Sequence, residues 1–245
     1  MFGPTLDRYA APKFFYPLAG RLVPWLGTLA AALLLLGATW GLVLAPADYQ
    51  QGDSYRIIFI HVPAAWLSML TYMVMAGGAF VFLVWRMKLA DMLAKCCAPL
   101  GAAFTALTLV TGSLWGKPMW GTWWAWDARL TSELVLLFLY LGVIALRGAI
   151  EEPQRAGRAT ALLTLVGVVN IPIIHFSVDW WNTLHQPASL TRLDGPAIHP
   201  AMLTPLLLMI AGFTVYFVAV LLQRMRCEIL ERERDARWLV ELDAP

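Results

Sequence analysis

Two of the four histidines stand where they could ligate a metal ion together. His61 lies in the segment Y-R-I-I-F-I-H-V-P, and His185 lies in W-W-N-T-L-H-Q-P. They flank, along the chain, the stretch that is richest in tryptophan, and imidazole nitrogens are common metal ligands. His175 lies in an apolar stretch, where packing or a role at a helix C-terminus is the simpler interpretation. His199 precedes Pro200 and is suited to start a helix. Spacing alone does not select the pair.

The segment 115–133 reads W-G-K-P-M-W-G-T-W-W-A-W-D-A-R-L-T-S-E. Five tryptophans fall within twelve of its positions: Trp115, Trp120, Trp123, Trp124 and Trp126. Tryptophan is enriched at membrane interfaces, which accounts for two or three such residues in a loop. Five in a glycine-punctuated loop predict instead a flat aromatic surface for a large planar ligand. Porphyrin fits, because it has two apolar faces, a metal that histidine ligates, and propionates that seek arginine or indole N–H donors.

The elements that position these residues are predicted to be helices that span a membrane. Of the 245 residues, 60% are hydrophobic and only 14% are charged. A bilayer core needs about 20 helical residues, and lipid offers the backbone no hydrogen-bond partner. Six apolar runs of suitable length occur: Leu22–Leu44, Val62–Trp85, Ala98–Trp115, Leu130–Leu146, Ala159–Phe176 and Ala201–Leu222. We therefore predict an all-α integral membrane protein, a single six-helix domain over residues 1–245, with segment 115–133 as a loop at one face.

The lysines and arginines predict the orientation of these helices. Fourteen of the eighteen fall on the side that holds both termini, and four fall on the other side. Cytoplasmic loops carry the excess of positive charge, so both termini are expected in the cytoplasm and all four histidines at the outer face. Cys96, Cys97 and Cys227 then lie on or near the reducing side, as free thiols. A net charge of +2 is too small to suggest a nucleic-acid partner.

The residues of the outer segments resemble those of a known family. W-G-K-P-M-W-G-T-W-W-A-W-D-A-R-L-T-S-E-L is similar to the tryptophan-rich "WWD" signature of haem-handling membrane proteins. Three further segments add to the likeness: A-P-A-D-Y-Q-Q-G at 45–52, S-Y-R-I-I-F-I-H-V-P-A-A-W at 54–66 and N-I-P-I-I-H-F-S-V-D-W-W-N-T-L-H-Q at 170–186. With them, the whole chain resembles the cytochrome c maturation protein C family. The chain length and the six runs match this small member of the superfamily rather than the larger cytochrome c synthase-type proteins.

The resemblance implies a function in the biogenesis of c-type cytochromes. Members take haem b at the periplasmic face of the bacterial inner membrane and deliver it to a periplasmic haem chaperone, cytochrome c maturation protein E. They associate with cytochrome c maturation proteins A and B, the ATPase and permease of a transporter-like complex, and with a small single-span protein, cytochrome c maturation protein D. The haem is expected to be non-covalent, because the chain has no C-x-x-C-H pattern. The protein is therefore expected to be a haem-handling component and not an enzyme.

The resemblance also implies roles for individual residues. The two axial iron ligands of the family match His61 and His185, and its aromatic bed matches Trp115, Trp120, Trp123, Trp124, Trp126 and Asp127. Asp127 is expected to N-cap the fourth helix and so fix the loop. Arg129 and Arg56 are the best candidates for pairing with the haem propionates, ahead of Lys117 and Arg192. Glu133, near the start of the fourth helix, is expected to be structural.

Two other classes of protein remain alternatives. An electron-transfer cytochrome b also uses histidines and membrane spans, but it usually ligates haem from within helices, and here the ligands are expected at the outer boundaries. A haem-transporting permease is expected to carry a buried polar path. The predicted spans show little of that kind beyond Asn170, threonines and serines.

Overall fold

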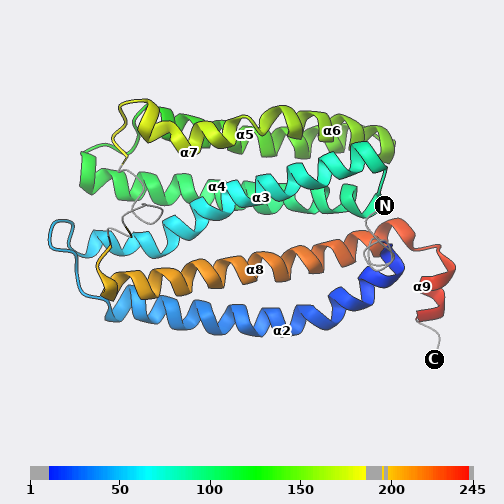
Figure 1. Cartoon of the computed structure of the whole chain (residues 1–245), viewed down its shortest axis with the longest axis horizontal. Coiled ribbons are helices and arrows are strands. Elements are labelled where there is room, and N and C mark those ends of the chain that lie inside the picture. Colours follow the sequence, from blue (N-terminus) through cyan, green and yellow to red (C-terminus); the bar gives the residue numbers. More distant parts are fainter. Residues whose placement is uncertain (1–10, 186–194, 196–197, 243–245) are drawn as a thin grey trace.

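The computed structural model describes residues 11–185, 195 and 198–242, and within these residues the ordered elements are helices (Figure 1). Helix α2 spans Pro12–Ala38 and continues as a π-helical turn, Thr39–Leu44. A short 3-10 helix, Asp53–Ile57, leads into α3. The remaining helices are α3 (Ile58–Trp85), α4 (Lys88–Trp120), α5 (Ala128–Ala149), α6 (Pro153–Gly167), α7 (Asn170–Trp180), α8 (Pro200–Glu233) and α9 (Arg237–Leu242). The predicted all-α class is thereby confirmed.

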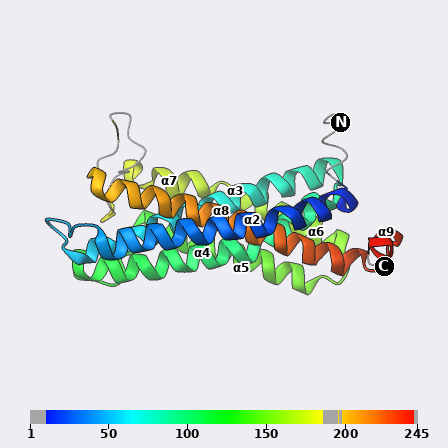
Figure 2. The ribbon, with the colours of Figure 1, turned by 90° about the horizontal axis from the view of Figure 1, so that it is seen from below.

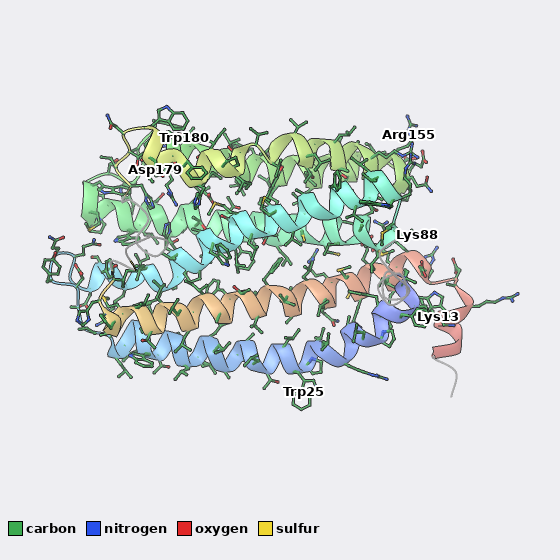
Figure 3. All side chains as sticks on the ribbon, in the orientation of Figure 1. Lys13, Trp25, Lys88, Arg155, Asp179 and Trp180 are labelled. Carbon is green, nitrogen blue, oxygen red and sulfur yellow. The ribbon has the colours of Figure 1, made fainter. Side chains whose placement is uncertain are left out.

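Six helical segments in the described part of the chain are long and apolar enough to cross a membrane, as the sequence predicted. Five are α2 with its π-helical turn, α3 with its 3-10 turn, α4, α5 and α8; the sixth is formed by α6 and α7 end to end. Asn170 lies at the junction of α6 and α7 and donates a hydrogen bond to the carbonyl oxygen of Ser132 on α5, at 2.9 Å. Trp25 projects away from the middle of α2 and is 78% exposed, as expected for a side chain in contact with lipid (Figure 3).

Several helices extend well beyond the apolar runs. α2 begins at Pro12 rather than Leu22, α4 covers Lys88–Trp120 rather than Ala98–Trp115, and α8 continues to Glu233. Hydropathy ends a run at the first charged residues, but a helix continues where such residues leave the lipid or pair with one another. The charged stretch after Leu222 is a case of this kind, because Glu228 and Ile229 in it are buried.

The helices run roughly along one axis and pack side by side (Figures 1 and 2). α2 lies against α8, and close approach is possible because Gly37 faces Met209 and Gly212 faces Leu34; a Cβ at either glycine would lie about 3 Å from the facing side chain. α3 and α4 form the middle of the bundle, and α5 covers α4 on the other side. The largest buried core surrounds Tyr72 and Tyr140, whose rings meet edge to face with centroids 5.1 Å apart.

The bundle has two distinct ends. At one end, which we call the tryptophan end, lie the connections from α2 to α3 and from α4 to α5, the end of α7 and the start of α8 (Figure 1). At the other end, which we call the termini end, lie the start of α2, the end of α8, and the short turns that join α3 to α4 and α5 to α6. The first span therefore begins, and the last span ends, at the same end of the bundle, as an even number of spans requires.

Candidate functional site

His61 lies inside a helix at the tryptophan end. The sequence placed it at the start of a span, but helical structure already begins at Asp53, so the histidine has regular helix on both sides. Its side chain is buried, with 8% of the residue exposed, and its Nδ1 lies 3.0 Å from Oγ1 of Thr111 on α4. The predicted place of His61 at the start of a span corresponds to the first turn of α3, with the 3-10 turn Asp53–Ile57 directly before it. Hydropathy does not detect the start of a helical segment whose first residues are polar, such as Asp53 and Arg56.

His185 reaches the same place from another part of the chain. It follows α7 in a non-helical stretch and is half-buried. Its ring centroid lies 6.4 Å from that of His61, with 31° between the ring planes, and 6.4 Å from the ring centroid of Trp120. The structure therefore brings together two histidines that are separated in the sequence by about half of the chain.

The tryptophan-rich segment is not a single loop. Its first part, through Trp120, is the last stretch of α4, and its last part, from Ala128, is the first turn of α5. Only residues 121–127 lie between the helices. Gly121, at a φ of 75°, ends α4 in the left-handed conformation that glycine adopts without strain. Pro118, which the sequence placed in a loop, lies in the last turn of α4.

The five tryptophans divide into an inner and an outer group. Trp115 packs edge-on against His61 with centroids 5.6 Å apart, and its indole N–H donates to Oε1 of Gln51 at 2.9 Å. Trp120 and Trp124 are also partly buried, whereas Trp123 and Trp126 are 55% and 78% exposed. Only part of the predicted aromatic bed therefore faces the histidine pair.

Asp127 connects the tryptophan segment to the segment of His185. Its Oδ1 accepts a hydrogen bond from the backbone N–H of Leu130 at 2.8 Å, which confirms that it N-caps α5. Its Oδ2 accepts from the backbone N–H of Leu184, at 3.3 Å, the residue directly before His185. One carboxylate thus fixes the start of α5 and the backbone next to the second histidine.

Two buried polar atoms of segment 115–133 have no hydrogen-bond partner in the part of the chain that the structure describes. Within the described residues, the indole N–H of Trp124 and the Oε1 of Glu133 are buried and make no hydrogen bond. Arg129 is partly buried and lies in electrostatic range of Glu133, Asp127 and His61. A buried polar atom without a partner costs free energy, so these two atoms are available to a further hydrogen-bonding group.

The other candidate cations are arranged differently. Arg56 is already engaged, because its Nε lies 2.8 Å from Oδ1 of Asp53 and its Nη1 donates to the carbonyl of Gly41 at 3.0 Å. Lys117 lies over the exposed ring of Trp123, 5.8 Å from its centroid. Arg192 lies outside the described residues. Of the predicted propionate partners, Arg129 is therefore the one that the structure places beside the histidine pair.

The other two histidines have local roles. His175 is exposed on α7 and packs its ring edge-on against Phe176, with centroids 4.7 Å apart. His199 is the N-cap of α8, and its Nδ1 accepts from the backbone N–H of Ala201 at 3.3 Å. Each therefore fits the simpler interpretation that the sequence offered for it.

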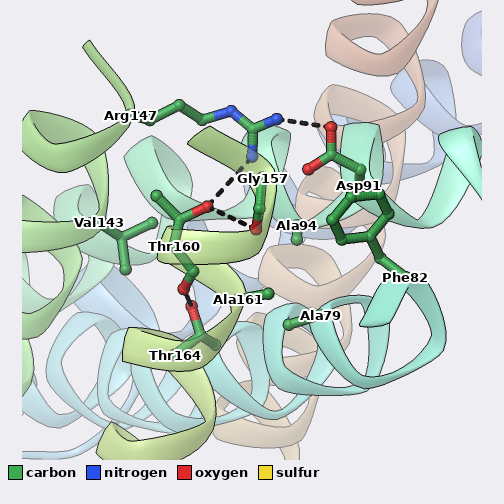
Figure 4. A pocket seen from close by; sticks show the side chains of 10 residues that line it. All are labelled: Ala79, Phe82, Asp91, Ala94, Val143, Arg147, Gly157, Thr160, Ala161 and Thr164. Carbon is green, nitrogen blue, oxygen red and sulfur yellow. Dashed lines mark hydrogen bonds and ion pairs between the residues drawn. The ribbon is translucent and has the colours of Figure 1, made fainter. Parts of the chain in front are cut away.

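Charged residues are buried at the termini end, where the helices extend beyond the predicted apolar runs. Asp91 on α4 is 3% exposed, and its Oδ2 accepts from Arg147 of α5 at 2.6 Å and from Arg232 of α8 at 2.7 Å. Glu228, also buried, accepts from Arg232 and from Lys95, the latter at 2.6 Å. A cavity of about 10 Å³, lined by Asp91 and Thr160 among others, lies beside this network (Figure 4). These charged residues lie in the parts of α4, α5 and α8 that extend beyond the predicted apolar runs, so the expectation of few polar residues within those runs stays a prediction.

Together, these features define a helical membrane protein that brings a buried and a half-buried histidine together beside indole rings at one end of its bundle. The chain belongs to the heme exporter protein C family, whose profile matches residues 5–240. It is 55% identical over 238 residues to heme exporter protein C of Escherichia coli (strain K12), an alignment covering 97% of this chain and 96% of that protein. The resemblance predicted from the sequence is thereby confirmed.

More distant relatives carry related names. The chain is 43% identical over 233 residues to heme exporter protein C of Paracoccus denitrificans (strain Pd 1222), which covers 95% of this chain and 96% of that protein. It is 47% identical over 191 residues to the putative cytochrome c biosynthesis ccmC-like mitochondrial protein of Marchantia polymorpha, covering 74% and 81% of the two chains. The similarity to bacterial relatives thus extends over nearly the whole chain.

Proposed function

We propose that this protein binds haem b non-covalently at the tryptophan end and delivers it to a periplasmic haem chaperone, cytochrome c maturation protein E. Relatives are named for haem export and for cytochrome c biosynthesis, which supports a role in haem handling during cytochrome c maturation. Those names also point to a transport or handling component rather than to a catalytic enzyme. The observation that carries the proposal is the pairing of His61 with His185.

The spacing of the two imidazole rings suits an iron atom held between them. An imidazole nitrogen lies about 2 Å from a bound transition-metal ion, and the ring centre lies roughly 1 Å beyond, so two axial ligands place their ring centres about 6 Å apart. The observed distance between the centroids of His61 and His185 is 6.4 Å. A low-spin, bis-histidine haem is the proposed cargo at this position.

The surroundings of the pair suit the rest of a porphyrin. The indole ring of Trp115 lies next to His61, and that of Trp120 lies next to His185, so both rings can pack against the macrocycle. The unpaired indole N–H of Trp124 and the guanidinium of Arg129 offer donors to propionate oxygens. In this arrangement His61 and His185 hold the iron, Arg129 and Trp124 hold the carboxylates, and the inner tryptophans exclude water.

The proposal places the tryptophan end in the periplasm and the termini end in the cytoplasm of a bacterial inner membrane. The distribution of lysine and arginine between the two sides of the six spans supports this orientation. It also places the protein in a complex with an ATPase, a permease and a small single-span protein, which are cytochrome c maturation proteins A, B and D. The name "heme exporter" of its relatives supports that assignment.

An electron-transfer role remains the second candidate, because His61 lies within a helix, as ligands of cytochromes b do. The two functions differ in what leaves the site. A carrier loses its haem to the chaperone, whereas an electron-transfer protein retains the haem through repeated reduction and oxidation. His185, in a non-helical stretch, favours the carrier.

The test is purification of the protein with its partners, followed by haem spectra and a measurement of covalent haem on the chaperone. His61→Ala and His185→Ala are each expected to shift the spectrum from low-spin toward high-spin haem and to impair chaperone loading. Exogenous imidazole is expected to restore the low-spin bands in both. Acidified acetone is expected to extract the haem from the wild-type protein, because the chain has no C-x-x-C-H pattern.

Two matched controls come from the remaining histidines. His175→Ala and His199→Ala are expected to retain the low-spin spectrum, since these side chains pack against Phe176 and cap α8. Loss of the low-spin bands in either control, with normal spectra in His61→Ala or His185→Ala, would contradict the ligand assignment. Haem that turns over with a quinone but never reaches the chaperone would favour electron transfer.

A further inference from the structure

The ring of His61 rests on three residues of α4. Nδ1 of His61 lies 3.0 Å from Oγ1 of Thr111, and the Trp115 indole packs against the same ring. Gly112 provides the space, because a Cβ at that position would lie only 3.2 Å from Cε1 of His61. The plane of the imidazole is therefore fixed by one face of a neighbouring helix.

The hydrogen-bond pattern of Thr111 determines which nitrogen of His61 carries the proton. A threonine hydroxyl has one proton, and Oγ1 of Thr111 lies 2.7 Å from the carbonyl oxygen of Leu107 and 3.2 Å from that of Thr108. Threonines in helices commonly donate to the preceding turn in this way. With its proton directed at the backbone, the hydroxyl accepts from His61, so Nδ1 is the protonated nitrogen. Nε2 then holds the lone pair that a metal requires.

We propose that Thr111 is a positioning residue that holds His61 in the Nδ1–H form and directs Nε2 at the iron of the bound haem. This inference rests on the proposed function, in which His61 is an axial ligand. A second hydrogen bond from a ligating imidazole fixes the ring and raises its basicity, and its loss typically weakens metal binding about 10–100-fold. A more basic ligand stabilises the oxidised iron, so Thr111 lowers the reduction potential of the bound haem.

The first test compares variants of Thr111 in the full-length, haem-loaded protein. Thr111→Val and Thr111→Ala remove the acceptor and are expected to raise the midpoint potential and to speed haem loss to apomyoglobin about tenfold. Thr111→Ser retains the hydroxyl and is expected to stay close to wild type. Thr105→Val is the matched control, because the buried Thr105 makes the same kind of bond to Gly101, at 2.8 Å on the same helix. It is expected to change neither quantity.

The second test detects the hydrogen bond itself. In His61→Ala, imidazole can fill the vacated position and donate its N–H to Thr111, whereas 1-methylimidazole can ligate iron but has no N–H. Imidazole is expected to bind about tenfold more tightly, a ratio of the size that one hydrogen bond provides. In the double variant His61→Ala with Thr111→Val, the two ligands are expected to bind equally well.

The outcomes separate this inference from the proposed function. If His61→Ala loses the low-spin spectrum, but Thr111→Val and Thr111→Ala leave the potential unchanged, the role of Thr111 is overturned and His61 remains a ligand. Equal binding of imidazole and 1-methylimidazole to His61→Ala has the same meaning. If His61→Ala keeps the wild-type spectrum, the ligand assignment fails, and the role of Thr111 fails with it.

Discussion

At the termini end of the bundle, buried charged side chains bond to one another; at the tryptophan end, buried polar atoms are left without partners. Asp91 accepts from two arginines, and Glu228 accepts from Arg232 and Lys95. By contrast, the indole N–H of Trp124 and one carboxylate oxygen of Glu133 make no hydrogen bond within the described residues. A network that satisfies itself holds helices together, whereas unsatisfied groups in a packed interior leave hydrogen-bonding capacity for another molecule.

The contrast has two exceptions at the termini end. Nε of Arg226 on α8 makes no hydrogen bond within the described residues, although Nη1 of the same side chain donates to Oε1 of Gln223 at 3.2 Å. Oδ1 of Asp91 also makes no hydrogen bond in the described part of the protein. It borders the small cavity of about 10 Å³ in Figure 4, which is close to the space that a single water molecule needs. A cavity of that size has no room for an organic ligand, so the unpaired oxygen of Asp91 does not make this end a second cargo site.

The largest expected effect comes from breaking the network at the termini end. Asp91→Ala leaves Arg147 and Arg232 without their shared anion and is expected to destabilise the fold by roughly 3–5 kcal/mol, the usual cost of an uncompensated buried charge. Thermal unfolding in detergent, followed by size-exclusion chromatography, measures the loss. Haem bound to the protein that remains folded is expected to keep its low-spin spectrum, because the histidine pair lies at the other end.

An exposed ion pair supplies the control for Asp91. Glu152 and Arg155 lie 3.7 Å apart at the same end, with side chains 57% and 78% exposed. Glu152→Ala is expected to cost less than about 1 kcal/mol, because solvent screens exposed pairs. Equal losses in Asp91→Ala and Glu152→Ala, or a change of haem ligation in Asp91→Ala, would remove the distinction between the two ends.

A smaller effect is expected from the two groups of tryptophans. Replacing the inner pair Trp120 and Trp124 by alanine is expected to reduce haem retention and abolish chaperone loading, since each aromatic contact contributes about 0.5–1.5 kcal/mol beyond area burial. Replacing the exposed pair Trp123 and Trp126 is expected to leave haem retention close to wild type. Haem content after purification and membrane insertion are measured for both double variants. Equal haem content in the two variants would contradict the division into groups.

The smallest effect concerns single indole N–H groups. Trp124→Phe removes a donor that is unpaired in the described residues, so it is expected to weaken haem binding by about 0.5–1.5 kcal/mol without destabilising the haem-free protein. Trp115→Phe removes a donor that is bonded to Gln51 and is expected to destabilise the haem-free protein instead. Calorimetric haem titration and thermal unfolding distinguish the two. If Trp124→Phe destabilises the haem-free protein as much as Trp115→Phe does, the N–H of Trp124 already has a partner in the haem-free protein.

The sequence predicted the spans and the residue types of the site, because both depend on local pattern. Each span is a run of apolar residues, and the tryptophan segment is conspicuous in composition alone. The helices extend past these runs, and hydropathy did not predict that, because Asp91, Lys95 and Glu228 look solvent-exposed until their partners on other helices are known. Asp91 and Arg232 are 141 positions apart along the chain, and no local pattern connects them.

The internal arrangement of the site could not be predicted from the sequence either. Thr111 lies 50 positions from His61, and threonines are common in these spans, so nothing distinguished this one before the packing of α3 on α4 was known. The division of the tryptophans depends on where α4 ends, which is set by Gly121 rather than by hydropathy. Asp127 was the exception, because an acidic residue before an apolar run is a local signal of a helix N-terminus.

The length of α5 gives the depth of the site in the bilayer. Its 22 residues rise about 33 Å, close to the roughly 30 Å of hydrocarbon in a bilayer, so its two ends mark the two surfaces of the lipid core. Arg129 then lies just inside one surface, and Glu133, four residues further along, lies roughly 8 Å inside it. The site is therefore partly immersed in a medium of low permittivity, where charge pairs are strong and water is scarce. Under the proposed function, the acceptor would have to contact the membrane surface in order to receive haem from this site.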